Sequence, residues 1–301
     1  MRQRAPAKIN LGLRILGRRP DGYHLLESIF LPLGCADELE VGLDPARPGR
    51  VQLVLEGAPE SVPSDGRNLA VRAARAFRSR VGEGPGISIR LRKRVPAAAG
   101  LGGGSSDAGA VLRALERLEP GRLGPRELAR LALELGADVP FFLDPRPARV
   151  TGVGERIEPL AGLRALPLLL AWKGPGLSTR TVFEAYRRSR APADSLTPRG
   201  SGPTIGALWP LREDGGLVRA GVLLRELVRN DLEPVATSVE PAVAELRREI
   251  EESGALVAGM SGSGPTVYGL FGDEAGAQAA ARRIRQRSGA EVRVTHTLPS
   301  P

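Results

Sequence analysis

A glycine-rich run followed by two hydroxyls and a carboxylate is the segment of this chain best suited to chemistry. Residues 100–107 read Gly-Leu-Gly-Gly-Gly-Ser-Ser-Asp. An alternating strand pattern enters this run over 87–95, and a pattern typical of a helix leaves it over 107–119. Glycine lets backbone N–H groups approach a ligand, and a helix N-terminus adds about half a positive charge there. The run therefore predicts a cradle for phosphate groups.

A second interpretation of the run, close packing of a helix on a strand, stays open. The sequence lacks the GxxxxGK[ST] motif, and Ser105 stands where GxGxxG would require its third glycine. Ser105 and Ser106 favour the phosphate interpretation, because hydroxyls there can hold phosphate oxygens or a Mg2+ ion.

The scarce residue types narrow the remaining chemistry. Only three of the 43 basic residues are lysines, Lys8, Lys93 and Lys173, so each is a candidate for a compact point charge. Two histidines, His24 and His296, nearly exclude a histidine-based triad or a multi-histidine metal site. The single Cys35 excludes a disulfide framework and a cysteine-rich zinc site.

Composition sets the class of protein. The chain has 301 residues, of which 42% are hydrophobic, enough for two domains. A net charge of +9 is suited to binding RNA or anionic metabolites. Aromatic residues make up only 4% of the chain, which is few for stacking on the bases of RNA. No apolar run reaches the ~20 residues of a membrane span. We expect a cytoplasmic protein, without nucleic-acid or membrane partners, that is a monomer or weak homodimer.

The N-terminal half must hold the glycine-rich run. Alternation over 7–15 predicts a strand with Lys8 and Asn10 on one face. Periodicity predicts further strands over 37–43 and 51–56 and helices over 68–81 and 125–135. Pro140 disfavours helical geometry at Val139, so Asp138 is expected on a rigid non-helical corner. Residues 149–160 are interrupted by glycine and are expected to connect two halves.

The C-terminal half predicts a ferredoxin-like layer of helices and strands. Residues 189–216, rich in Pro, Gly, Ser and Arg, are expected to form a long loop. The expected strands are 166–172, 255–260, 266–271 and 291–297, and the expected helices are 179–188, 217–229, 241–253 and 274–287. We therefore expect an α+β protein with domains over 1–155 and 156–301.

Several separated motifs stand out along the chain. Three of them are Pro6-Ala7-Lys8-Ile9-Asn10-Leu11, Gly100 to Ser106, and Met260-Ser261-Gly262-Ser263-Gly264-Pro265-Thr266, which resemble the motifs of the GHMP kinase superfamily. Asp21-Gly22-Tyr23-His24, Gly136-Ala137-Asp138-Val139-Pro140-Phe141-Phe142 and Asn230-Asp231-Leu232-Glu233-Pro234 resemble one branch, whose substrate is a cytidine-diphosphate alcohol. Residues 187–216 match nothing in that pattern.

The resemblance implies ATP-dependent phosphorylation of a hydroxyl, with ATP and Mg2+ as cofactors. It implies an N-terminal nucleotide-binding domain like ribosomal S5 domain 2 and a C-terminal ferredoxin-like domain. It makes Lys8 and Asp138 the catalytic pair. The candidates for holding the Mg2+ ion are the hydroxyls of Ser105 and Ser106. The implied ATP-binding residues are Pro96, Ala97, Ala98, Ala99, Gly100, Leu101, Gly102, Gly103, Gly104, Ser105 and Ser106. The implied substrate-binding residues are Asn10, Tyr23, His24, Asn68 and Phe183.

Each of these residues also has an ordinary structural interpretation. Asp138 could be a turn residue, Lys8 a solvated charge, Tyr23 a core ring and His24 a hydrogen-bonded structural side chain. Two functional alternatives remain as well. One is another GHMP kinase that acts on a different small alcohol, of the homoserine or mevalonate type. The other is a basic RNA-binding protein, for which binding would depend steeply on salt.

Overall fold

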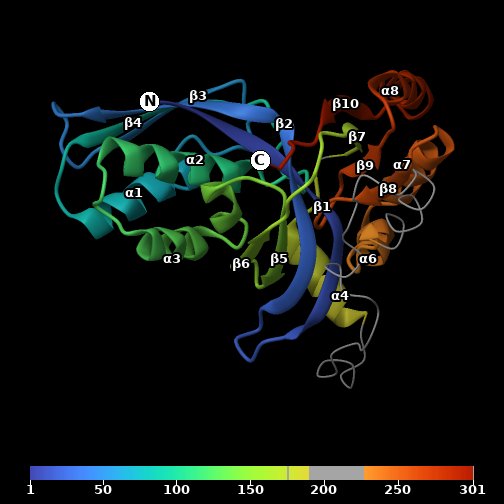
Figure 1. Ribbon diagram of the computed structural model, residues 1–301, viewed down its shortest axis with the longest axis horizontal. Helices are drawn as coiled ribbons and strands as arrows, with labels where there is room; N and C mark the ends of the chain where they lie inside the picture. Colours follow the sequence, from blue (N-terminus) through green and yellow to red (C-terminus); the bar gives the residue numbers. More distant parts are fainter. Residues whose placement is uncertain (175, 190–226, 301) are drawn as a thin grey trace. The chain divides into compact units, whose positions relative to one another are not determined.

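The computed structural model describes residues 1–174, 176–189 and 227–300 in two compact units (Figure 1). Unit 1 contains residues 1–7, 35–97 and 102–145, and unit 2 contains residues 8–34, 98–101 and 146–301. The domain boundary expected at 155/156 stays a prediction. Residues 190–216 of the loop expected over 189–216, and nearly all of the helix expected over 217–229, lie outside the described residues.

Two long strands, β1 (Arg2–Arg18) and β2 (His24–Asp44), contribute residues to both units. Both are longer than the strands expected over 7–15 and 37–43. In β2, residues 27–33 are buried without interruption, so the strand lacks the alternation by which a half-buried strand is found. This is why its first half escaped the sequence pattern.

Unit 1 combines three helices with paired strands, and the last of these helices packs on the other two. Strand β4 (Gly86–Arg92) pairs antiparallel with Glu38–Asp44 of β2 and parallel with β3 (Val51–Glu56). The helices are α1 (Leu69–Val81), α2 (Gly103–Leu118) and α3 (Pro125–Leu135), and a short 3-10 helix, η1 (Pro140–Leu143), follows them. Phe77, Ile89 and Leu112 belong to the shared core, in which helix and strand side chains meet.

Unit 2 contains two groups of strands. Strands β5 (Ala148–Gly152) and β6 (Arg156–Pro159) form a hairpin, and β5 also pairs with Leu26–Phe30 of β2. The segment expected to connect two halves, residues 149–160, thus contains most of a β-hairpin, and its role as a connection stays a prediction. Gly152 and Gly154 have positive φ and form the tight turn of this hairpin, where glycine is the residue best suited.

The second group in unit 2 is an antiparallel sheet in the order β10-β7-β9-β8. Its strands are β7 (Pro167–Trp172), β8 (Val257–Met260), β9 (Val267–Leu270) and β10 (Glu291–His296). The helices of this unit are α4 (Thr179–Arg188), α6 (Glu233–Val239), α7 (Ala242–Glu252) and α8 (Glu274–Ser288). Helices and strands together confirm the α+β class. No helix among the described residues is long and apolar enough to cross a membrane.

Candidate active site

The glycine-rich run forms the entry to α2, and the helix begins earlier than its sequence pattern indicates. It starts at Gly103 rather than at 107, because Gly102 adopts the left-handed conformation (φ 69°) as its N-cap. Ser105 and Ser106 therefore lie in the first turn. The N-cap makes no side-chain hydrogen bond to the helix, so the first-turn N–H groups are not capped by a side chain. An uncapped helix N-terminus suits an anion.

The donor set at this helix end fits a nucleotide phosphate with its Mg2+ ion. Ser106 is fully buried, and its hydroxyl has no hydrogen-bond partner in the described part of the chain. Gly104 is exposed, and a Cβ at that position would meet only the Leu69 side chain, at 3.3 Å. Within the described ranges, no three His, Cys, Asp or Glu side chains are grouped to hold a metal.

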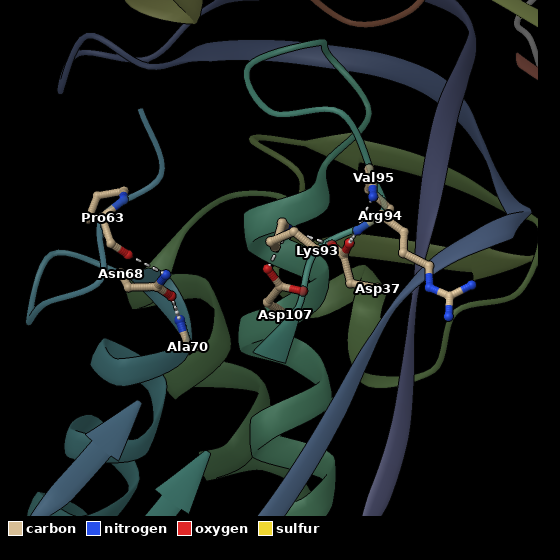
Figure 2. A network of polar contacts seen from close by, with 8 residues as sticks. All are labelled: Asp37, Pro63, Asn68, Ala70, Lys93, Arg94, Val95 and Asp107. Carbon is tan, nitrogen blue, oxygen red and sulfur yellow. Dashed lines mark hydrogen bonds and ion pairs between the residues drawn. The ribbon is translucent and has the colours of Figure 1, made fainter. Parts of the chain in front are cut away.

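A buried ionic group of three residues ties the two ends of the glycine-rich run to β2 (Figure 2). Lys93 Nζ lies 2.5 Å from Asp37 Oδ2 and 2.7 Å from Asp107 Oδ2. Asp37 Oδ1 accepts the backbone N–H groups of Arg94 at 2.5 Å and Val95 at 2.8 Å. Asp37 thus holds the backbone before the run directly, and Lys93 links it to Asp107 in the first half of α2.

Two members of this ionic group, Asp107 and Lys93, have shifted pKa values. Burial raises the pKa of Asp107 to about 8, with Lys93 opposing the shift and Asp37 adding to it. Burial by itself would lower the pKa of Lys93, but Asp107 and Asp37 outweigh it and the pKa is raised. Asp37 accepts three hydrogen bonds, whereas Asp107 Oδ1 has no partner among the described residues. Near neutral pH, Asp107 is therefore the member that holds a proton.

Lys8 and Asn10 lie together in unit 2, as the alternation of β1 predicts. Both are buried, with exposed fractions of 3% and 2%, so Lys8 is not a solvated surface charge. The Lys8 ammonium lies 2.5 Å from Asn10 Oδ1 and 4.8 Å from the centroid of the Phe30 ring. An ammonium removed from water in this way has a fixed position from which it can act on an anion.

Asp138 lies in unit 1, in the turn between α3 and η1, and is half-buried. Asp138 lies on a corner outside the helices, but the geometry expected at Val139 was wrong: Val139 has helical angles (φ −63°, ψ −40°) because the turn continues directly into η1. The Arg113 guanidinium holds this region by donating to the carbonyls of Phe142 and Arg4. Burial lowers the pKa of Arg113 to about 10. Lys8 belongs to unit 2, and its pairing with Asp138 in catalysis stays a prediction.

Aromatic side chains gather around the start of β2 in unit 2. His24 stacks on Phe183 with ring centroids 5.1 Å apart and meets Tyr186 edge-on at 6.0 Å. Burial, together with Arg18 and Arg187, lowers the pKa of His24, so the ring is held neutral. Tyr23 is 64% exposed, which excludes the interpretation as a core ring and leaves its face open for stacking.

Asn68 has a structural task that the sequence did not assign to it. Its Oδ1 accepts from Ala70 N at 2.9 Å as the N-cap of α1, and its Nδ2 donates to the Pro63 carbonyl at 2.7 Å (Figure 2). A role in substrate binding stays a prediction for this residue.

The second glycine-rich turn supports the first in unit 2. Ser261 Oγ donates to the Gly100 carbonyl at 3.0 Å, and Asn230 Nδ2 donates to the carbonyls of Met260 and Gly262. A Cβ at Gly100 would lie 2.4 Å from the Ser261 carbonyl oxygen. The 261–265 turn therefore packs directly against Gly100, where a larger residue would not fit.

Two family models cover more than half of the chain. The model for the GHMP kinases N terminal domain matches residues 68–144, and the model for the GHMP kinases C terminal matches residues 207–290. The chain belongs to the GHMP kinase family. In this GHMP kinase, the first model contains α1, the glycine-rich run, α2 and Asp138.

Relatives with curated names are similar over nearly the whole length of this GHMP kinase. A 4-diphosphocytidyl-2-C-methyl-D-erythritol kinase of Anaeromyxobacter sp. (strain K) is 44% identical over 94% of this chain and 85% of its own. One of Pelobacter propionicus is 37% identical over 98% of both chains. The crystal structure of a 4-(cytidine 5'-diphospho)-2C-methyl-D-erythritol kinase has a TM-score of 0.77 and 35% identity, covering both chains fully.

Proposed function

We propose that this protein transfers the terminal phosphoryl group of ATP to the 2-hydroxyl of 4-diphosphocytidyl-2-C-methyl-D-erythritol, giving the 2-phosphate and ADP. This reaction belongs to the non-mevalonate route to isoprenoid precursors. The observation that carries the proposal is the identity of 37–44% over nearly the full chain to kinases named for this substrate. Family membership also favours a kinase over an RNA-binding protein.

The nucleotide phosphates would bind at the start of α2. The uncapped N–H groups of its first turn and the exposed backbone at Gly104 support this placement. Ser105 and Ser106 would hold the Mg2+ ion, which supplies charge neutralisation between the phosphates when bound. The buried Ser106 hydroxyl without a partner in the described structure supports that assignment.

Phosphoryl transfer depends mainly on positioning and on charge stabilisation. Asp138 would accept the proton of the attacking hydroxyl, whose oxygen then bonds to the γ-phosphorus as the bond to ADP breaks. Lys8 would stabilise the charge on the transferred group. The burial of Lys8 supports this role, since an ammonium acts more strongly outside water.

The aromatic cluster would bind the cytidine end of the substrate. The exposed Tyr23 ring could stack on the cytosine, and neutral His24, held by Phe183, could hydrogen-bond to its edge. Asn10 lies beside Lys8 and would contact the alcohol portion.

Purified protein assayed against four alcohols tests the substrate. We expect ADP release with 4-diphosphocytidyl-methylerythritol and none with homoserine, mevalonate or galactose, and 31P NMR should detect the new phosphate ester. Turnover only with an alcohol that lacks cytidine would reject the proposal in favour of another GHMP kinase.

Two variants test the catalytic roles. Asp138→Asn should lower kcat by about 10²–10⁴-fold, and Lys8→Met by about 10²–10³-fold, with the fold unchanged. Lys173→Met is the matched control, because Lys173 is exposed and should be dispensable. Turnover of Asp138→Asn within a few-fold of the original protein contradicts the general-base role.

A further inference from the structure

A relay of buried hydrogen bonds in unit 2 joins Lys8 to the backbone of β1 through two side chains. Asn10 Oδ1 lies 2.5 Å from Lys8 Nζ, and Asn10 Nδ2 donates to Ser28 Oγ at 3.0 Å. Ser28 Oγ in turn donates to the Gly12 carbonyl at 2.5 Å. Ser28 is fully buried, so water cannot readily replace its hydroxyl.

The relay has a direction, and Ser28 sets it. A serine hydroxyl has one proton, and a carbonyl oxygen can only accept, so the proton of Ser28 points to Gly12. The lone pairs of Oγ are then left for the NH2 group of Asn10. The amide oxygen of Asn10 therefore faces Lys8. In the reverse orientation the NH2 group would face the ammonium, and no hydrogen bond could form because both groups are donors.

The backbone at the far end of the relay is held in place. Gly12 has a φ of +76°, and a Cβ there would lie 1.8 Å from the Leu227 carbonyl oxygen, so this glycine is packed tightly. The backbone N–H of Asn10 donates to Ser261 Oγ at 3.2 Å. A fixed carbonyl at Gly12 therefore fixes the hydroxyl of Ser28, and through it the amide of Asn10.

We propose that Ser28 is a positioning residue for phosphoryl transfer, which orients the Asn10 amide and thereby holds the Lys8 ammonium at its working position. This inference rests on the proposed function, because it takes Lys8 as the group that stabilises the transferred phosphoryl. Ser28 itself touches neither ATP nor the alcohol; it acts through Asn10. Misplacement of a catalytic group by about 1 Å can cost on the order of 10²-fold in rate.

The first test separates turnover from binding. Ser28→Ala should lower kcat by about 10–100-fold while KM for ATP stays within about threefold, because only the ammonium loses its position. Ser28→Thr keeps the hydroxyl and should restore most of kcat. The control is Thr297→Val, which removes another buried hydroxyl of unit 2, the acceptor for Leu166 N, and should leave kcat unchanged. An unchanged kcat in Ser28→Ala overturns the proposal.

The second test asks whether Ser28 acts through Asn10. In an Asn10→Ala background, adding Ser28→Ala should change kcat by less than about twofold, since the relay is already broken. If the double variant instead loses kcat by the product of the two single losses, Ser28 acts independently of Asn10 and the relay is rejected.

A third measurement needs no turnover. In 15N-labelled protein, the side-chain NH2 of Asn10 should exchange with solvent slowly in the original protein and in Ser28→Thr, and much faster in Ser28→Ala. Equal exchange rates overturn the relay. Absence of turnover with the cytidine substrate in the unmodified protein would reject the proposed function alone, so the two failures are distinguishable.

Discussion

Replacing Asp107 by asparagine should stabilise the protein, and increasingly so as the pH rises. Asp107 shares Lys93 with Asp37, is buried, and has a pKa raised from 3.8 to about 8. The folded protein therefore favours the neutral acid, which an asparagine imitates. A group whose pKa is raised on folding contributes its full stabilisation at pH values below its pKa in the unfolded chain. That contribution is lost as the pH rises through the pKa in the folded protein.

The magnitude follows from the two pKa values. Between about pH 4 and pH 8 the unfolded chain has released this proton and the folded protein has not, so stability falls by about 1.4 kcal/mol per pH unit. From pH 6 to pH 9, ionisation of Asp107 lowers the free energy of the unfolded chain by about 4 kcal/mol. Ionisation of Asp107 in the folded protein above pH 8 offsets about 1.4 kcal/mol of this loss of stability. The stability gap between Asp107→Asn and the original protein should therefore widen by about 2–3 kcal/mol over this range.

The assay must report on unit 1, and tryptophan fluorescence is unsuitable because the residues of unit 1 include no tryptophan. Amide hydrogen exchange of α2 and β4, measured at pH 6, 7, 8 and 9 and corrected for intrinsic rates, gives the opening free energy directly. Asp37→Asn is the matched control. It removes the carboxylate that accepts three hydrogen bonds and should cost about 2–4 kcal/mol throughout. Parallel pH curves for Asp107→Asn and the original protein would refute the reasoning.

Three further substitutions test the site and its support. Tyr23→Ala should weaken the cytidine substrate at least about tenfold more than ATP, whereas Tyr23→Phe keeps the ring and most of the affinity; equal losses for both ligands would refute stacking. Gly104→Ala should leave the melting temperature unchanged or slightly raised, since its Cβ meets only Leu69, yet weaken ATP at least about tenfold in a titration. An unaltered affinity for ATP in Gly104→Ala would show that the phosphates do not bind at Gly104. Gly109→Ala should destabilise unit 1 by about 1–3 kcal/mol, because its Cβ would lie 2.6 Å from Phe142 Cβ; a neutral effect on hydrogen exchange would contradict that packing.

Regular periodicity made most helices and strands predictable, and its absence explains the failures. The helix 125–135 has proline at its first position and glycine after its last, and both of its ends were correct. Alternation placed Lys8 and Asn10 on one face of β1. The first half of β2 is buried on both faces, so its polar and apolar residues do not alternate and local pattern could not reveal it.

The start of α2 shows a different limit. Glycine disfavours helix by local preference, so Gly103 and Gly104 were expected in a loop. The left-handed Gly102 and the packing of α2 against α1 outweigh that preference. Val139 is a second case in which the surrounding structure outweighs a local preference. A residue before proline favours extended geometry, but Val139 is helical because the chain continues into η1.

The most informative compositional signal was the scarcity of lysine, and the structure gives it a physical reason. Lys93 places one ammonium within 2.7 Å of two carboxylates, and a Cβ at Gly103 would lie 3.5 Å from its Nζ. A planar guanidinium is wider and could not occupy this place without moving the first turn of α2. Lys8 is likewise buried against an amide and an aromatic ring, whereas Lys173 is exposed. In a chain where arginine fills nearly every surface cationic position, two of the three lysines thus remain where a compact charge must fit into the interior. No spacing along the sequence distinguishes the structural lysine from the catalytic candidate, because what separates them is Asp37 and Asp107, brought to Lys93 only by the fold.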